Sequence, residues 1–230
     1  MEKTANRPVQ AVIFDLDGLL INTETISYAL YQDLLRPYGH TFSVEDYAQN
    51  YSGKSELHNM QAIIARFGLP ISVAQGTALV SAQEKMYFAR GVPLKTGAKE
   101  LLVYLKQKGY LIALASSSVR TRALATLSQH GIASYFDAMV FGAEVARGKP
   151  HPDIFCKACD KLHAAPEDCL VLEDSEAGIQ SAFSAHIPVI CIPDMRQPGT
   201  AFQDMAQAVL PILTDVIDYQ IGRASCRERV

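Results

Sequence analysis

The chain has 230 residues, of which 49% are hydrophobic and 20% are charged, and its formal net charge is −3. This balance is typical of a globular protein and differs from the composition of a disordered chain. An acidic chain without a basic stripe gives no reason to expect a nucleic-acid partner. Five cysteines without regular spacing argue against a disulfide framework, so we expect reduced thiols.

Neither the first ten residues nor any later segment has the apolar run of a signal peptide or of a membrane span, which needs about 18 residues. We therefore expect a soluble, cytoplasmic protein without membrane contact, and we infer no obligate protein partner. The last ten residues, 221–230, carry three arginines and no apolar periodicity. We interpret them as a non-native tail; a natural basic tail is the alternative.

The N-terminal part of the chain predicts one strand followed by a helical segment. Residues 9–14 form a short apolar run that ends at Asp-Leu-Asp-Gly, which is typical of a buried strand stopping at a turn. Between residues 24 and 90 the apolar positions follow helical periodicity instead. Gly68-Leu69-Pro70 and Gly91-Val92-Pro93 are turn or linker signals within and after this segment.

From residue 98 onward, predicted helices and strands alternate. Helices are expected at 98–109, 119–131, 152–163 and 175–186, and strands at 110–115, 138–141, 169–173 and 187–192. Such alternation predicts an α/β fold with a doubly wound, mostly parallel sheet. We expect an α/β core made of residues 1–20 and 92–220, with residues 21–91 inserted as an all-helical cap domain.

Reactive side chains follow several of these strands. The residues concerned are Asp15, Asp17, Ser116, Lys149, Glu173 and Asp174. Each has an ordinary explanation when it is taken alone, as a turn residue, a helix cap or a solvated charge. Ligands of open parallel sheets bind at the carboxyl ends of the strands, however, so these side chains are expected to lie on one edge.

Carboxylates gathered on one edge would repel one another without a cation, whereas Mg²⁺ takes oxygen ligands. A lysine and a hydroxyl nearby complete a site for an anion. Together these groups have the chemistry that transfer of a phosphoryl group requires.

Four segments of the chain resemble the motifs of the haloacid dehalogenase superfamily, in their order and in their approximate spacing. They are FDLDGLLINTE, LASSS, GKPHPDIF and LEDSEAGI. The helical insertion is similar in place and length to the small cap of the branch that contains β-phosphoglucomutase and sugar-phosphate phosphatases. The resemblance covers residues 9–215 and implies the Rossmann-like core of that superfamily.

The resemblance also implies roles for these residues. Asp15 would be the nucleophile that forms an aspartyl-phosphate, and Asp17 would be the general acid and base. Ser116, with Ser117, and Lys149 would bind the phosphoryl group. Mg²⁺ would be held by Asp15, Asp17 and Asp174, with Glu173 assisting.

The expected activity is hydrolysis of a small phosphorylated metabolite, with a sugar phosphate as the expected substrate class. The cap turn at Gly53, Lys54 and Ser55 is our candidate for substrate contact, and a solvated helix start is its alternative. A phosphosugar mutase is the second hypothesis. It is disfavoured because Ser27 and Glu56 stand where the β-phosphoglucomutase pattern has a histidine and an arginine. A non-catalytic binding protein on the same fold is the third, and it would be expected to lack one of the core residues.

Overall fold

A computed structural model describes residues 9–219, and the predicted tail at 221–230 lies outside this range. The described chain divides into two compact units. One consists of residues 9–21, 94–194 and 198–219, and the other of residues 22–93 and 195–197. The two units change over at residues 21/22 and 93/94, whereas the sequence predicted 20/21 and 91/92. The short segment 195–197 of the second unit was not predicted.

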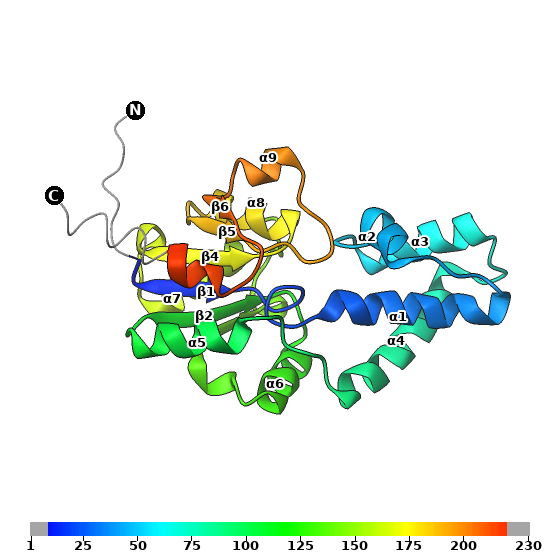
Figure 1. Ribbon diagram of the computed structural model, residues 1–230, viewed down its shortest axis with the longest axis horizontal. Helices are drawn as coiled ribbons and strands as arrows, with labels where there is room; N and C mark the ends of the chain where they lie inside the picture. The colour runs from blue at the N-terminus through cyan, green and yellow to red at the C-terminus, as the bar shows by residue number, and fades with distance from the viewer. Residues whose placement is uncertain (1–8, 220–230) are drawn as a thin grey trace. The chain divides into compact units, whose positions relative to one another are not determined.

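The first unit is built on a parallel sheet of six strands, which confirms the predicted fold class (Figure 1). The strand order is β3-β2-β1-β4-β5-β6. The strands are β1 (Ala11–Phe14), β2 (Leu111–Ser116), β3 (Ala138–Phe141), β4 (Cys169–Glu173), β5 (Val189–Cys191) and β6 (Ala208–Val209). The helices are α5 (Ala98–Gln107), α6 (Arg120–Gln129), α7 (Asp153–Leu162), α8 (Glu176–Ser184) and α9 (Thr200–Gln203).

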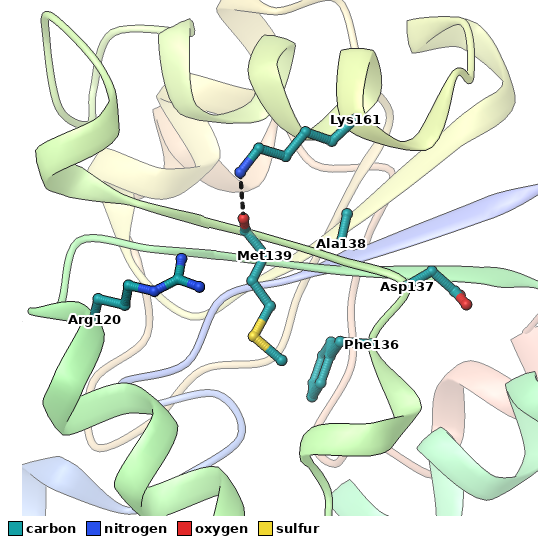
Figure 2. Close-up of a pocket in the computed structure, with 6 residues that line it drawn as sticks. All are labelled: Arg120, Phe136, Asp137, Ala138, Met139 and Lys161. Carbon is teal, nitrogen blue, oxygen red and sulfur yellow. Dashed lines mark hydrogen bonds between the residues drawn. The ribbon is translucent and has the colours of Figure 1, made fainter.

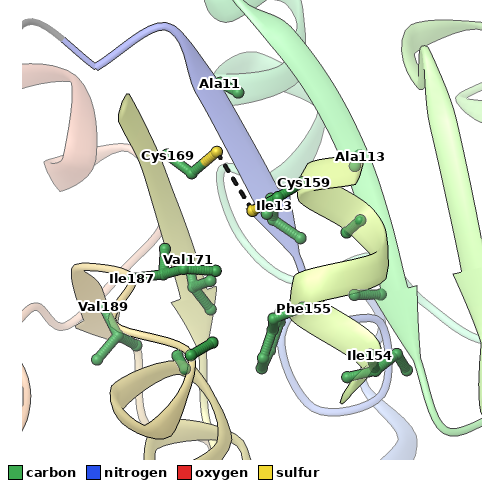
Figure 3. Close-up of a cluster of buried hydrophobic side chains, with 14 of the residues drawn as sticks. Ala11, Ile13, Ala113, Ile154, Phe155, Cys159, Cys169, Val171, Ile187 and Val189 are labelled. Atoms are coloured by element: carbon green, nitrogen blue, oxygen red, sulfur yellow. Dashed lines mark hydrogen bonds between the residues drawn. The ribbon is translucent and has the colours of Figure 1, made fainter. Parts of the chain in front are cut away.

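The central strands are apolar apart from Ser116 and Glu173, the last residues of β2 and β4, because both faces of the sheet are covered. All four residues of β1 are buried, and alternate residues point to opposite faces. Ala11 and Ile13 belong to a cluster that includes side chains of α7 and α8 (Figure 3). Cys159 of α7 lies in this cluster, with its Sγ 3.6 Å from the Sγ of Cys169, so it serves as a core residue.

The second unit is helical throughout, as expected for residues 21–91. Its helices are α1 (Thr23–Leu35), α2 (Val44–Asn50), α3 (Glu56–Phe67) and α4 (Val73–Arg90). Serines begin three of them, because the hydroxyls of Ser43, Ser55 and Ser72 accept hydrogen bonds from the first-turn amides. Gly68 ends α3 in a left-handed conformation, with φ of 61°.

Two elements of the first unit were not predicted, namely α9 and β6. Their lengths of four and two residues are too short for a periodic pattern to develop. Short 3₁₀ turns at Arg36–Tyr38, Ala133–Tyr135, Gly142–Glu144 and Pro166–Asp168 were missed for the same reason. None of the helices in residues 9–219 combines the length and the apolar character that crossing a membrane requires.

The core cluster generates a stability prediction for α7. Ile154 is fully buried in this cluster, whereas Cys156 is exposed on the same helix (Figure 3). Ile154→Ala should lower the free energy of unfolding by about 2–5 kcal/mol, because it removes buried methyl groups and leaves a cavity. Cys156→Ala should change it by less than about 0.5 kcal/mol. Urea unfolding measures both, and equal effects of the two variants would contradict this account of the core.

Candidate active site

The first group of predicted site residues lies at the carboxyl ends of three neighbouring strands, β2, β1 and β4. Phe14 of β1 is in register with Leu114 of β2 and with Leu172 of β4. The three strands therefore end at nearly the same level, where Asp15 follows β1 and where Ser116 and Glu173 are the last residues of β2 and β4. The expectation that these side chains share one edge of the sheet agrees with the geometry.

Lys149 joins two of these carboxylates. Its Nζ lies 2.5 Å from Oδ1 of Asp15 and 2.6 Å from Oε1 of Glu173, and it donates a third hydrogen bond to the carbonyl of Ala115 at 3.1 Å. The lysine side chain is only 7% exposed. All three of its donors are therefore used, which is what a buried ammonium requires. The ring of Phe155 lies below it, with the centroid 5.0 Å from Nζ.

Burial and like charges shift the pKa values of this cluster. Burial raises the pKa of Asp15 to about 7, with Glu173 and Asp17 adding to the shift and Lys149 opposing it. Burial, Glu173 and Asp15 raise the pKa of Asp174 well above its usual value. Burial alone would lower the pKa of Lys149, but the carboxylates of Asp15 and Glu173 outweigh it and raise it. The ammonium is therefore retained at neutral pH, beside more acidic groups than it can neutralise.

Glu173 has a full set of partners. While Oε1 accepts from Lys149, Oε2 accepts from the backbone amides of Asp174 and Ser175, both at 2.9 Å, and from the Ser175 hydroxyl at 3.0 Å. This fully buried carboxylate thus fixes both the lysine and the turn into α8. Sequence reasoning had placed it beside a metal ion instead.

Two glycines make room for the carboxylates at the end of β4. A Cβ atom on Gly18 would lie 2.2 Å from Oδ2 of Asp174, and one on Gly178 would lie 1.8 Å from Oε1 of Glu173. Gly18 also has a left-handed φ of 87°. The turn after Asp17 and the first turn of α8 can therefore approach the carboxylates only because side chains are absent there.

The serines after β2 have different surroundings. Ser116 is fully buried, and its Oγ accepts a hydrogen bond from the amide of Ser118 at 3.0 Å, whereas Ser117 is exposed. Ser118 donates its hydroxyl to Oδ2 of Asp17. The guanidinium of Arg122 lies 3.2 Å from Oδ1 of the same carboxylate. Asp17 is thus held by side chains from the loop after β2 and from α6.

Carboxylate oxygens and a backbone carbonyl are suitable ligands for Mg²⁺. Among the described residues, no three side chains of His, Cys, Asp or Glu form a metal-binding group by themselves. Both carboxylate oxygens of Glu173 and of Asp17 have partners, whereas the contact of Asp15 with Lys149 uses Oδ1 alone. The candidate donors for a cation at this edge are therefore the carboxylates of Asp15 and Asp174. Burial, with the neighbouring carboxylates adding to it, raises the pKa values of Asp15 and Asp174, and a cation bound here would favour their ionised forms.

The helical unit contains a cavity of about 110 Å³. Its lining includes Ser27, Lys54 and Glu56, three of the five cap positions that the sequence analysis singled out. Glu24 and Glu84 also line it, so carboxylates outnumber the single lysine there. Burial, with Glu84 close by, raises the pKa of Glu56.

The two neighbours of Lys54 have structural roles. The amide of Gly53 donates to Oε1 of Glu24 at 3.3 Å, and Ser55 is the N-cap of α3. The predicted turn therefore lies beside the cavity, but only Lys54 contributes to its lining.

A second cavity, of about 380 Å³, lies beside β3, the edge strand (Figure 2). Its lining residues are Arg120, Phe136, Asp137, Ala138, Met139 and Lys161. Lys161 donates to the carbonyl of Met139 at 2.7 Å, so this part of the strand edge is covered by a side chain. None of the lining residues belongs to the carboxylate cluster, and we assign the chemistry to the end of β1.

Three residues near the carboxylate cluster were missed by sequence reasoning. Ser118 and Arg122 contact Asp17, and burial raises the pKa of Asp194, whose Oδ1 lies 2.5 Å from Nζ of Lys95. Asp194 follows β5, and it contributes to the raised pKa of Asp174. The strand-end argument applied to β5 would have found it. For Ser118 and Arg122, the only signal that the sequence offered was their separation of four residues.

The close approach of Gly178 to Glu173 generates a second prediction. Gly178→Ala should lower the free energy of unfolding by about 1–3 kcal/mol, because the added methyl group overlaps a fixed carboxylate. This loss occurs although alanine favours helix by about 1 kcal/mol over glycine. Gly148→Ala is the control, since its Cβ would meet no atom within 4 Å. Chemical unfolding of both variants tests this, and a Gly178→Ala protein as stable as wild type would refute the packing.

Comparison with known proteins agrees with this geometry. The sequence profile of the haloacid dehalogenase-like hydrolases matches residues 12–192. The chain is 32% identical to the phosphorylated carbohydrates phosphatase of Thermotoga maritima over 179 residues, 78% of this chain and 82% of that protein. It is 30% identical to the validoxylamine A 7'-phosphate phosphatase of Streptomyces hygroscopicus over 213 residues, 93% and 98% of the two chains.

Solved structures agree as well. A HAD family hydrolase from Deinococcus radiodurans, solved with bound phosphate and sodium, superposes with a TM-score of 0.80 at 25% identity, covering 91% of this chain and 93% of that one. The profile match spans all four motifs and the helical insertion. The chain belongs to the haloacid dehalogenase-like hydrolase family.

Proposed function

We propose that this protein is a Mg²⁺-dependent phosphatase that hydrolyses a small phosphorylated metabolite, a sugar phosphate or a related ester, through an aspartyl-phosphate. The observation that carries the proposal is the buried cluster of Asp15, Lys149, Glu173 and Asp174 at the end of β1. An excess of carboxylates around one fixed ammonium suits a cation and a phosphoryl group together. The names of the Thermotoga and Streptomyces relatives are those of phosphatases, which supports hydrolysis.

In the proposed reaction Asp15 attacks phosphorus. Lys149 engages Oδ1 of Asp15, so we assign the attack to Oδ2. As the new bond forms, the bond from phosphorus to the leaving oxygen breaks, and Asp17 donates a proton to that oxygen. Asp17 then takes a proton from water as the water attacks phosphorus, which releases inorganic phosphate and restores the carboxylate of Asp15.

The remaining residues bind and orient the reacting groups. Ser116 and Lys149 would contact the phosphoryl oxygens, and Glu173 holds Lys149 in place. Mg²⁺ would be held by Asp15, Asp174 and the carbonyl of Asp17, where it neutralises charge on the phosphoryl group. Glu173, which the sequence predicted as a ligand, is not part of this proposed set, because both of its carboxylate oxygens have other partners.

The cavity of the helical unit supports a phosphatase over a mutase. A bisphosphate intermediate would need cationic groups for its second phosphate, but Glu24, Glu56 and Glu84 line this cavity with Lys54. Asn59 also lines it, and its buried Oδ1 accepts no hydrogen bond within the described part of the chain. Hydroxyl groups of a ligand would suit such acceptors better than a phosphate.

The nucleophile generates the first prediction of function. Asp15→Asn should lower turnover of phosphate esters at least about 100-fold while the protein stays folded, because the amide keeps the volume but cannot attack phosphorus. Asp160→Asn, the same chemical change on the exposed surface of α7, should leave turnover unchanged. Phosphate release over a panel of metabolites measures both. An Asp15→Asn enzyme with a tenth of wild-type activity would remove Asp15 from this role.

The pKa of Asp15 gives a pH dependence for metal binding. Its folded value of about 7 lies above the unfolded value of 3.8, so the ionised carboxylate destabilises the metal-free fold as the pH rises from about 4 to 7. Mg²⁺ binds the ionised form, so added Mg²⁺ should raise the melting temperature more at pH 8 than at pH 6. Asp174→Asn should abolish the difference. An equal effect of Mg²⁺ at both pH values, or turnover that persists in excess EDTA, would contradict the proposed site.

The acidic lining of the cap cavity gives a prediction that distinguishes phosphatase activity from mutase activity. Incubation with β-glucose 1-phosphate and glucose 1,6-bisphosphate should release inorganic phosphate and form little glucose 6-phosphate, because the cavity repels a second phosphate. Both products can be followed in one coupled assay. Isomerisation faster than phosphate release would favour the mutase.

A further inference from the structure

Asp17, Ser118 and Arg122 form a set of three side chains that are bonded to one another. The hydroxyl of Ser118 donates to Oδ2 of Asp17, and one nitrogen of Arg122 lies 3.2 Å from Oδ1 and 3.3 Å from Oδ2. The same guanidinium donates to the Ser118 hydroxyl. Every pair in the set is therefore joined, so the carboxylate is restrained by two partners that also restrain each other.

The position of Arg122 is unfavourable for its own helix. Arg122 lies in the first turn of α6, where the helix dipole favours acidic side chains, and this turn contains none. The carboxylate that balances the guanidinium comes from Asp17, 105 residues earlier in the chain. Ser118 is fixed in turn by Ser116, whose Oγ accepts from the Ser118 amide. The arrangement thus links the phosphoryl-binding loop to the proposed acid.

We propose that Arg122, together with Ser118, is a positioning residue that holds the carboxylate of Asp17 for proton transfer to the leaving group. The inference rests on the proposed function, because it assumes that Asp17 is the general acid. Arg122 acts through Asp17 and not on the substrate. One guanidinium nitrogen contacts both oxygens of the carboxylate and so restrains its direction, while the side chain of Asp17 stays 29% exposed and can reach a proton acceptor.

Dependence on the leaving group tests this role. Nitrophenolate departs readily without a proton, whereas the alkoxide of a sugar needs one as the bond to phosphorus breaks. The parameter kcat/KM reports formation of the aspartyl-phosphate, the step in which Asp17 donates its proton. A misplaced acid should therefore harm the hydrolysis of sugar phosphates and spare that of nitrophenyl phosphate.

The experiment compares Arg122→Met, Arg122→Lys and Ser118→Ala with glucose 6-phosphate, phenyl phosphate and p-nitrophenyl phosphate as substrates. Arg122→Met should lower kcat/KM about 10- to 100-fold with glucose 6-phosphate but less than about threefold with p-nitrophenyl phosphate. Ser118→Ala should give the same order of effects. Arg122→Lys should recover part of the loss, since lysine restores the positive charge but not the planar, delocalised guanidinium.

Arg120→Met is the matched control. Arg120 begins the same helix, but its guanidinium lies 3.6 Å from Glu144 and above the ring of Phe141, and its side chain lies beside the edge-strand cavity (Figure 2). The Arg120→Met substitution removes a positive charge from the same helical turn without changing any contact of Asp17. Its kcat/KM should stay within about twofold of wild type for all three substrates.

Equal losses of Arg122→Met on all three esters would overturn the inference, as would a rise in KM with unchanged kcat, which indicates direct binding of substrate. If Arg122→Met fails to fold, as judged by its melting curve, Ser118→Ala and Arg122→Lys decide between the same outcomes. Failure of the proposed function gives a different result. In that case Asp15→Asn remains active, or Asp17→Asn shows no dependence on the leaving group.

Discussion

The ion pairs of Lys149 are the interaction on which the rest of the site depends. The loop after β3 carries the ammonium to carboxylates that follow β1 and end β4, so one side chain links three segments of the fold. Removing either partner would leave a buried charge without compensation, which is strongly destabilising. The backbone carbonyl of Ala115 completes its hydrogen bonds, so a strand of the sheet also holds the lysine in position.

Burial makes this arrangement reactive as well as ordered. Asp15 and Asp174 lie in an environment that disfavours their ionised forms, and one ammonium cannot balance them together with Glu173. A divalent cation would offset the excess negative charge of the carboxylates. It would also offset the charge of the phosphoryl group of a bound substrate. Glu173 orients Lys149 and the turn into α8, so in the proposed mechanism it supports the site while Asp15 reacts.

Much of the fold and the order of the site residues could be predicted from the sequence, because the signals are local. Apolar runs define β1 and β4, and Asp15 and Asp174 follow their ends. The direction of each side chain is not a local property. Glu173 and Asp174 are adjacent, yet one binds the lysine while the other lies against Gly18. The contacts of Arg122 with Asp17 likewise depend on how α6 packs beside the turn after β1, which no periodicity encodes.

The central claim is that Asp15 becomes covalently phosphorylated. Rapid acid quenching during turnover, followed by borohydride reduction, converts an aspartyl-phosphate to homoserine, which peptide mass spectrometry locates. The account predicts homoserine at position 15 in wild type only when a phosphate ester is present. Unmodified Asp15 throughout turnover, or homoserine at another position, would contradict it.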